Sequence, residues 1–148
     1  MKERIKAIIS DIDGTLALRQ DKIRSPYEFE KCETDLVNVP VADIVGKYKE
    51  DGYWIIIVTG RSREFHMKTV DWLRSNGIRF DLLFMRDPKL LDENGNMVGD
   101  VIVKEKIYLE DIKDKFDVLF VLDDRNRIVS LWRDKFNLIC LQVANGDF

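Results

Sequence analysis

The chain alternates between short apolar runs and longer stretches in which apolar residues recur at helical spacing. Several of the short runs are rich in isoleucine and valine, which is typical of strands buried on both faces of a parallel sheet. The five runs are Ile5–Ser10, Trp54–Val58, Asp81–Met85, Val118–Leu122 and Leu138–Gln142.

Helical patterns fill much of the chain between these runs. In the first of them Val41, Ile44 and Val45 fall on one face, and Gly52 follows as a C-terminal cap. Helices are expected over Leu36–Asp51, Ser62–Asn76, Val103–Lys115 and Arg125–Lys135. Strands that alternate with helices predict an α/β fold, in which a central five-stranded parallel sheet is flanked by helices.

The composition is that of a folded globular protein. The 148 residues are 45% hydrophobic and 34% charged, and a chain of this length buries roughly 70% of the surface that it exposes when unfolded. We therefore expect one domain over residues 1–148. The net charge of −3 provides no global positive field for holding a long duplex. A nucleic-acid substrate would be contacted only locally, near an end.

The cysteines and the N-terminal residues bear on location. Cys32 and Cys140 stand in no metal-binding spacing, and we expect buried or half-buried thiols in a reducing compartment. The N-terminal apolar run is too short for a signal sequence, and no run approaches the about 18 apolar residues of a membrane span. The expected protein is cytoplasmic and has no membrane segment.

Two aspartates follow the first predicted strand, in the segment Asp11-Ile12-Asp13-Gly14-Thr15. Carboxylates this close repel each other at the end of a buried strand, and a divalent cation relieves the repulsion. Carboxylate oxygens suit Mg²⁺ better than they suit zinc. The chemistry that fits is phosphoryl transfer, in which Asp11 attacks phosphorus and Asp13 serves as general acid and then as general base. Alone, the pair fits an acidic helix-capping turn equally well.

Three further polar sites follow strands or begin a helix. Thr59-Gly60-Arg61 follows the second strand, where a hydroxyl and backbone N–H groups can bind phosphate oxygens. Asp123-Asp124 follows the fourth strand and would complete a Mg²⁺ site. Lys104 or Lys106, near the start of the third helix, needs an anionic partner because the helix dipole disfavours a cation there. Since the carboxyl ends of parallel strands share one sheet edge, these residues are expected to meet.

These motifs together resemble the haloacid dehalogenase (HAD) superfamily of phosphotransferases. Asp11-Ile12-Asp13-Gly14-Thr15 matches its first motif, Thr59 its second, a lysine its third and Asp123-Asp124 its fourth. The resemblance implies an aspartate-based, Mg²⁺-dependent phosphatase on a Rossmann-like sheet.

A narrower resemblance covers nearly the whole chain. It is to the 3′-phosphatase domain of bacteriophage polynucleotide kinase/phosphatase. The segments that carry it are Arg24-Ser25-Pro26-Tyr27, Glu30-Lys31-Cys32-Glu33-Thr34-Asp35, Val103-Lys104-Glu105, Phe116-Asp117-Val118, Asp123-Asp124-Arg125 and Gln142–Phe148. The last segment is long and has no catalytic role that chemistry would predict.

The resemblance implies a role for each matched residue. Asp11, Asp13 and Lys104 are similar to catalytic residues. Lys104 is preferred over Lys106 because the family has an Asp and a Lys four residues apart, as Asp100 and Lys104 are here. The implied substrate-binding residues are Arg24, Thr59, Gly60, Arg61 and Asp100, and the implied Mg²⁺ ligands are Asp11, Asp13, Asp123 and Asp124.

The chain departs from that family in places. Thr59 replaces a serine, and the region Arg86–Gly99 does not align. No GxxxxGK[ST] loop occurs, so no kinase domain is expected in this chain. The interval between Asp13 and Thr59 admits one helix and a small flap around Gln20–Cys32 but no large lid, which leaves the site open to a polymer end.

The expected function is the removal of 3′-phosphates from DNA or RNA ends during repair. The resemblance also implies opening of 2′,3′-cyclic phosphates. A small-molecule phosphatase for nucleotides or sugar phosphates would use the same residues and stays an alternative. A phospho-acceptor receiver domain also gathers Asp, Thr and Lys on such a sheet, but its phosphorylated Asp follows the third strand, where this chain has only Asp87.

Overall fold

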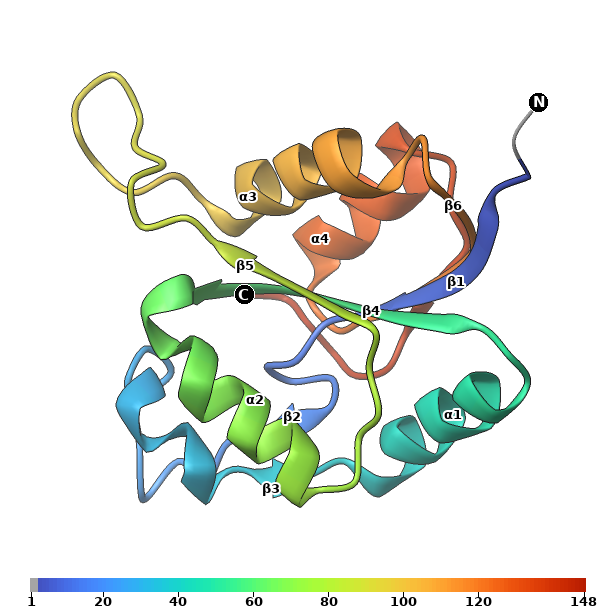
Figure 1. The fold of residues 1–148 in the computed structure, drawn as a ribbon. Helices are drawn as coiled ribbons and strands as arrows, with labels where there is room; N and C mark the ends of the chain where they lie inside the picture. The colour runs from blue at the N-terminus through green and yellow to red at the C-terminus, as the bar shows by residue number, and fades with distance from the viewer. Residues whose placement is uncertain (1–2) are drawn as a thin grey trace.

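A five-stranded parallel sheet forms the centre of the computed structural model, which describes residues 3–148 (Figure 1). Its strands are β1 (Ile5–Ser10), β4 (Trp54–Ser62), β5 (Leu82–Arg86), β6 (Phe116–Asp123) and β7 (Cys140–Gln142). They lie in the order β5-β4-β1-β6-β7, so the chain adds strands on one side of β1 and then on the other. This reversal creates a switch point at the carboxyl ends of β1 and β6, where open α/β sheets bind ligands. The predicted α/β fold is confirmed.

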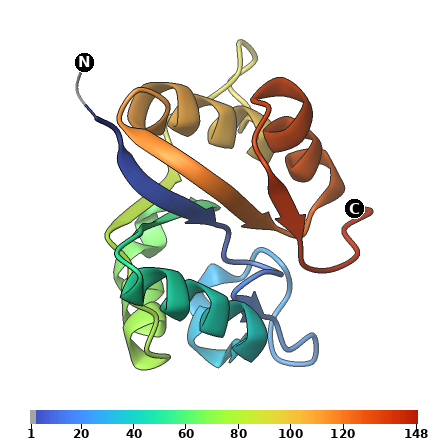
Figure 2. The same ribbon diagram turned by 90° about the vertical axis from the view of Figure 1, so that its right-hand side faces the viewer.

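Helices cover both faces of the sheet. Figures 1 and 2 show α1 (Val39–Glu50) and α2 (His66–Ser75) on one face and α3 (Asp100–Ile107) and α4 (Asn126–Ser130) on the other. Two π-helical turns, Tyr108–Ile112 and Leu131–Lys135, extend α3 and α4. Among residues 3–148 the structure contains no helix that is both long and apolar enough to cross a membrane.

The isoleucine-rich sequence of β4 follows from the helices that cover both faces of the sheet. Successive side chains of a strand point to opposite faces. Ile55 and Ile57 pack into the core under α1 and α2, whereas Ile56 and Val58 pack into the core with Trp132 on the other face. Because both faces are covered, every one of these positions must be apolar, and the alternation typical of a half-exposed strand does not occur.

The predicted start of the first helix is wrong. Leu36 and Val37 form strand β3 (Leu36–Val37), which pairs antiparallel with β2 (Ala17–Leu18), and α1 begins only at Val39. Asn38 holds the extended backbone, since its N–H donates to the carbonyl of Leu16 at 2.8 Å and its side-chain amide donates to the carbonyl of Thr15 at 2.9 Å. A proline in the first helical turn then suits the start of α1.

The segment between β2 and β3 is a small flap. It contains a 3₁₀ helix, Phe29–Thr34, in the place where the sequence predicts a flap around Gln20–Cys32. The flap packs against α2, where the indole nitrogen of Trp72 donates to the carbonyl of Asp35 at 3.0 Å.

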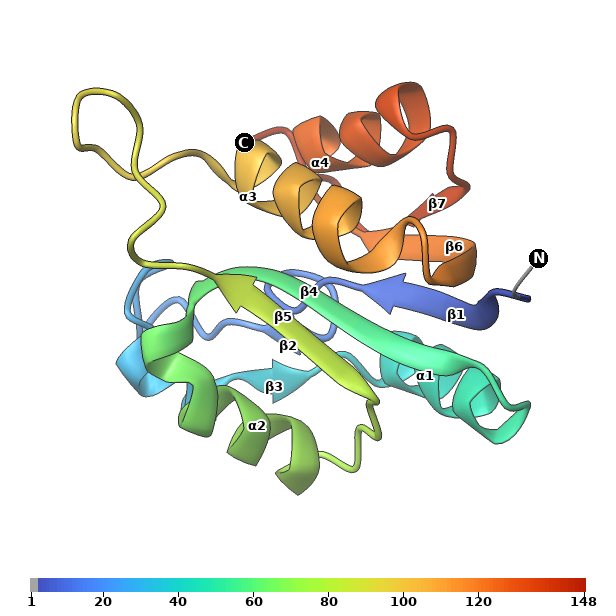
Figure 3. The same cartoon turned by 45° about the horizontal axis from the view of Figure 1, so that its top comes forward.

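Two further boundaries differ from the prediction and affect the site. The strand β4 continues through Thr59-Gly60-Arg61 to Ser62, with a shift in its pairing to β5 between Val58 and Ser62. Helix α3 starts at Asp100 and not at Val103, because Gly99 caps it and an acidic first residue is favoured by the helix dipole. Asp100 and Lys104 therefore lie one turn apart on one helix. The loop between β5 and α3 projects beyond the sheet (Figure 3).

The two thiols provide a test of the core. Cys32 and Cys140 are both buried, and burial raises the pKa of each thiol, that of Cys140 to about 12 with Asp123 contributing. Only the thiolate reacts with disulfide reagents. We expect negligible reaction of the native protein with a chromogenic disulfide at pH 8, and reaction of both thiols after denaturation. Rapid modification of either thiol in the native state would contradict this packing.

Candidate active site

Three carboxylates gather at the carboxyl edge of the two adjacent strands β1 and β6. Asp11 follows β1, and its N–H donates to the carbonyl of Leu122 at 3.0 Å, which sets Asp11 beside Asp123 at the end of β6. Asp11, Asp123 and Asp124 each offer a carboxylate oxygen within 4.8 Å of the others, and all three residues are buried. This is the cluster expected at the switch point of the sheet.

Lys104 enters this cluster from α3. Its ammonium nitrogen lies 3.0 Å from Oδ1 of Asp11 and 3.0 Å from Oδ2 of Asp123. One ammonium against three carboxylates leaves a formal charge of about −2 in a buried site, which a divalent cation would neutralise. Lys106, the alternative considered from the sequence, is exposed and pairs with Glu110.

The electrostatics of the cluster reflect this excess of negative charge. Burial raises the pKa of Asp11 well above its usual value; Lys104 opposes the shift, whereas Asp123, Asp124 and Asp13 add to it. Burial and Asp123 likewise raise the pKa of Asp124. Burial disfavours the charged form of Lys104, but Asp11 and Asp123 outweigh it and raise the pKa of this ammonium group. Lys104 is therefore cationic at neutral pH.

Neighbouring groups fix the carboxylates in place. Thr15 donates its hydroxyl to Oδ1 of Asp124 at 3.1 Å, and the N–H of Asp124 donates to Oδ1 of Asp123 at 2.9 Å. Gly14 turns with φ of +83°, and a Cβ atom there would lie 2.2 Å from Oδ2 of Asp124. A glycine is required at this position because the turn after Asp13 approaches the Asp124 carboxylate so closely.

Asp13 lies outside the three-carboxylate cluster, although the sequence analysis names it among the metal ligands. Its side chain instead accepts two hydrogen bonds from Arg61, at 2.9 Å from Nε and 2.8 Å from Nη2, and one from Arg24 at 3.3 Å. The physical reason is the turn at Gly14 and two nearby guanidinium groups, which give this carboxylate fixed cationic partners. Its side chain is 37% exposed, unlike those of Asp11 and Asp123.

Asp35 holds both of these arginines, and the sequence analysis assigns it no role. Its carboxylate accepts from Nε and Nη2 of Arg24 at 2.7 Å each and from Arg61 at 3.3 Å. The side chains of Arg24, Arg61 and Asp35 are 1% exposed or less. Two buried guanidiniums are thus balanced by Asp35 and Asp13, with the ring of Phe29 against both. The sequence signal that could have identified Asp35 is its place at the end of the family-matched segment Glu30–Asp35.

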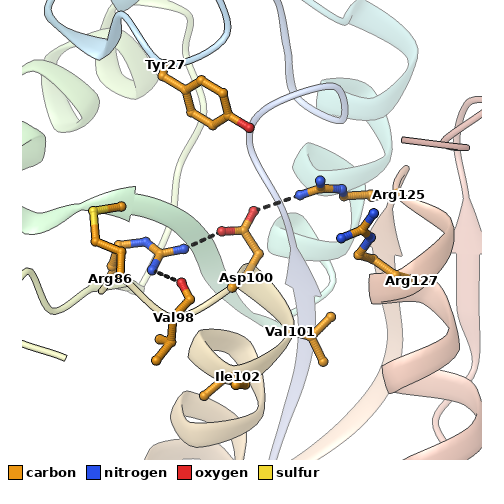
Figure 4. A pocket seen from close by; sticks show the side chains of 10 residues that line it. Tyr27, Arg86, Val98, Asp100, Val101, Ile102, Arg125 and Arg127 are labelled. Carbon is orange, nitrogen blue, oxygen red and sulfur yellow. Dashed lines mark hydrogen bonds and ion pairs between the residues drawn. The ribbon is translucent and has the colours of Figure 1, made fainter. Parts of the chain in front are cut away.

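Asp100 is the centre of a third network. Its carboxylate pairs with Arg86 and lies 3.2 Å from Arg125 (Figure 4). A Cβ atom on Gly60 would lie 2.6 Å from Oδ1 of Asp100, so the Asp100 carboxylate presses against the backbone beside Thr59. Asp100 and Gly60 are predicted from the sequence, whereas Arg86 and Arg125 are not, because both arginines become relevant only through their contact with Asp100.

Thr59 lies buried in β4 next to these groups. Its hydroxyl oxygen accepts from the N–H of Arg61 at 3.2 Å, which leaves its hydroxyl hydrogen available as a donor. In this stretch of β4, Arg61 belongs to the Asp13 network and Gly60 packs against Asp100.

The C-terminal segment, Gln142–Phe148, packs against the loop that follows β6. A Cβ atom on the buried Gly146 would lie 1.8 Å from the carbonyl oxygen of Asp124, and the carbonyl of Gly146 accepts from the N–H of Asn126 at 2.9 Å. Arg125 donates to the carbonyl of Phe148 at 2.8 Å, with its guanidinium 5.2 Å from the centre of that ring. The segment therefore braces the loop that carries Asp123 and Asp124.

Residues 5–148 match a family model described as the polynucleotide kinase PNKP phosphatase domain. A protein of Autographa californica nuclear polyhedrosis virus is 32% identical over 133 residues, which are 87% of this chain and 18% of the viral protein. The name of that viral protein describes a bifunctional polynucleotide kinase/RNA ligase.

Solved structures agree with this match. Two structures of the Pnkp1/Rnl/Hen1 complex, one described as an RNA repair complex, contain chains that are 39% and 38% identical, with TM-scores of 0.88 and 0.90. The match covers 98% and 100% of this chain but 44% and 49% of those chains, so this chain spans less than half the length of these relatives. A class C acid phosphatase from Bacillus anthracis shares the fold, with a TM-score of 0.67 and 16% sequence identity. The match covers 97% of this chain and 68% of the acid phosphatase chain.

The buried Asp35 network predicts a large effect of one substitution. Asp35→Asn removes the charge that balances Arg24 and Arg61, and we expect the free energy of unfolding to fall by about 3 to 5 kcal/mol. Asp21→Asn, in the exposed ion pair with Arg19 on the same flap, should change it by less than about 1 kcal/mol. Urea denaturation measures both. Equal stability of the two variants would contradict the balancing role of Asp35.

The close packing of the C-terminal segment predicts a second effect. Gly146→Ala should push the segment away from Asp124 and lower the melting temperature, because the added methyl group meets a backbone oxygen. Gly46→Ala is the matched control, since its Cβ meets nothing within 4 Å and alanine is favoured in helix α1 by about 1 kcal/mol. Thermal unfolding measures both variants. A melting temperature of Gly146→Ala equal to that of wild type would show that this close contact does not contribute to stability.

Proposed function

The chain belongs to the family of polynucleotide kinase phosphatase domains, and from this premise we propose that it is a Mg²⁺-dependent phosphatase that removes 3′-phosphates from DNA or RNA ends. The observation that carries the proposal is the division of its aspartates. Asp11 lies with Asp123, Asp124 and Lys104, whereas Asp13 stands apart on Arg61. A nucleophile and a general acid need these different surroundings.

In the first chemical step an oxygen of Asp11 attacks the phosphorus atom of the 3′-phosphate. A bond forms between that oxygen and phosphorus, the bond from phosphorus to O3′ breaks, and Asp13 gives its proton to O3′. In the second step Asp13 takes a proton from a water molecule whose oxygen attacks the same phosphorus. The bond to Asp11 breaks, inorganic phosphate leaves, and both aspartates return to their starting states. One water molecule is consumed.

The arginine network orients Asp13 for both proton transfers. Two hydrogen bonds from Arg61 and one from Arg24 fix the plane of its carboxylate, while its side chain remains 37% exposed, enough to meet a substrate or a water molecule. Asp35 keeps the two guanidiniums in place. Under this proposal Arg24 and Arg61 serve the reaction through Asp13.

Lys104 and Thr59 are the groups that would hold the phosphate. Lys104 carries a fixed positive charge next to the attacking oxygen of Asp11, which offsets the negative charge of nucleophile and phosphate. The hydroxyl of Thr59 can donate to a phosphate oxygen at the edge of β4. Both groups are positioned before substrate arrives, so no reorganisation is needed during the reaction.

The three-carboxylate cluster fits Mg²⁺. Asp11, Asp123 and Asp124 supply hard oxygen donors within 4.8 Å of one another, and the excess negative charge of the site calls for a cation. When bound, Mg²⁺ would neutralise the charge that builds up on the transferred phosphoryl group. Asp13 contributes no side-chain oxygen to this cluster, so we assign the side-chain ligands to the other three aspartates.

The family and the small flap support a nucleic-acid end as the substrate. The matches to the two Pnkp1/Rnl/Hen1 structures, one of them described as an RNA repair complex, extend over nearly all of this chain, which favours a nucleic-acid end over a small phosphate ester. The flap between β2 and β3 is far smaller than a lid domain, which is compatible with a polymer that continues beyond its terminal phosphate. The leaving group we propose is therefore the 3′ oxygen of a nucleic-acid strand.

Phosphate release tests this function. A 3′-phosphorylated oligonucleotide should be hydrolysed with Mg²⁺ and not with a chelator, whereas a 5′-phosphorylated oligonucleotide and free 5′-nucleotides should react poorly. Asp11→Asn should lower kcat by more than about 1,000-fold because the nucleophile is lost. Asp117→Asn, exposed on the same strand as Asp123 but at its opposite end, is the control and should keep wild-type activity.

Two outcomes would refute the proposal. Faster turnover of mononucleotides or sugar phosphates than of the 3′-phosphorylated oligonucleotide would assign the site to small molecules. Full activity of Asp11→Asn would refute the mechanism itself.

A further inference from the structure

A pocket of about 410 Å³ opens beside Asp100 (Figure 4). Its walls come from four parts of the chain. They are Tyr27 of the flap, Arg86 at the end of β5, the segment Met97–Ile102 that enters α3, and Arg125 and Arg127 at the start of α4. The volume lies within the range of small-ligand sites in proteins, about 300 to 1,000 Å³.

Two elements that line the pocket also carry residues of the catalytic cluster. Asp100 lines the pocket, and Lys104, which touches Asp11, lies one turn further along the same helix. Arg125, on the opposite wall, is the residue after Asp124. A ligand in this pocket therefore lies beside a substrate bound at Asp11, on the same edge of the sheet.

The charge of the pocket favours an anion. Its lining contains three guanidinium groups and one carboxylate, and that carboxylate, of Asp100, already pairs with Arg86 and Arg125. Arg127 is exposed and forms no ion pair with any residue between 3 and 148. A local excess of about two positive charges stands out on a chain whose net charge is −3, and guanidinium groups of this kind are common partners of nucleic-acid phosphates.

The rest of the lining is apolar or aromatic. Val98, Val101 and Ile102 form one wall, and Ile102 is 52% exposed. Tyr27 reaches toward the pocket from the flap (Figure 4), and most of its surface, 79%, is open to solvent. Proteins that bind single strands stack bases on exposed aromatic rings and hold phosphates with guanidinium groups, and this pocket offers both kinds of side chain.

We propose that this pocket binds the nucleotide that precedes the 3′-terminal one. The phosphodiester that joins this nucleotide to the 3′-terminal one contacts Arg127 and Arg125, and the base of this nucleotide stacks on Tyr27. The inference rests on the proposed 3′-phosphatase function, and it makes a strand of two or more nucleotides the preferred substrate over a single 3′-nucleotide.

The test compares kcat/KM of the full chain for a 3′-phosphorylated mononucleotide and the corresponding 3′-phosphorylated dinucleotide. Wild type should prefer the dinucleotide by about tenfold or more. Arg127→Gln and Tyr27→Leu should each remove most of this preference, mainly through KM, whereas Tyr27→Phe should keep it because stacking needs the ring and not the hydroxyl. Arg79→Gln is the matched control, since Arg79 is an exposed arginine that precedes β5, at the end of that strand opposite to Arg86.

Salt dependence separates a phosphate contact from a general structural effect. Loss of one phosphate contact to a single strand should reduce the slope of log kcat/KM against log salt concentration by about 0.7. Arg127→Gln should show this reduction with the dinucleotide, and Arg79→Gln should not. An unchanged slope for Arg127→Gln would contradict the phosphodiester contact.

The outcomes distinguish the pocket from the function on which it rests. A wild-type preference for the dinucleotide that Arg127→Gln and Tyr27→Leu both retain would overturn the pocket and leave the 3′-phosphatase standing. Equal turnover of mononucleotide and dinucleotide by wild type would also overturn the pocket. Failure of wild type to hydrolyse any 3′-phosphate with Mg²⁺ would overturn the proposed function itself.

Discussion

The burial of three carboxylates at one sheet edge is the constraint on which the rest of this structure depends. Asp11, Asp123 and Asp124 are brought together because β1 and β6 are neighbours and end at the same level. Three buried negative charges are strongly unfavourable unless they are compensated. Lys104 supplies part of the compensation, and the three carboxylates could hold a metal ion that supplies the rest.

The surrounding networks keep other charged groups in their places around this cluster. Asp35 holds Arg24 and Arg61, which in turn hold Asp13 away from the three carboxylates. Asp100 holds Arg86 and Arg125 at the entrance to the neighbouring pocket. Each of these arginines is thus held by a carboxylate, and the Asp13 and Asp100 networks stay separate from the three-carboxylate cluster although all share one edge of the sheet.

The sequence predicts the parts of this arrangement that are local. The five strands follow from apolar runs, and Asp11, Thr59 and Asp123 follow from their places at strand ends. Asp35 and Arg86 could not be assigned this way, because their partners lie far away in the chain, as Arg61 does from Asp35. The two-residue strand Leu36–Val37 was hidden because two apolar residues next to a helical pattern continue its period, and only the contact of Asn38 with Leu16 reveals the extended backbone.

The central claim is that Asp11 is the nucleophile and Asp13 a separate acid–base group, and trapping the phosphorylated enzyme tests it most directly. Asp13→Asn should still react with p-nitrophenyl phosphate and Mg²⁺, since that leaving group needs no proton, but should be slow to hydrolyse the intermediate. The account predicts a burst of one p-nitrophenol per enzyme and, after acid quenching, one phosphoryl group on the peptide that contains Asp11 by mass spectrometry. A phosphoryl group on another residue, or turnover with none on Asp11, would contradict it.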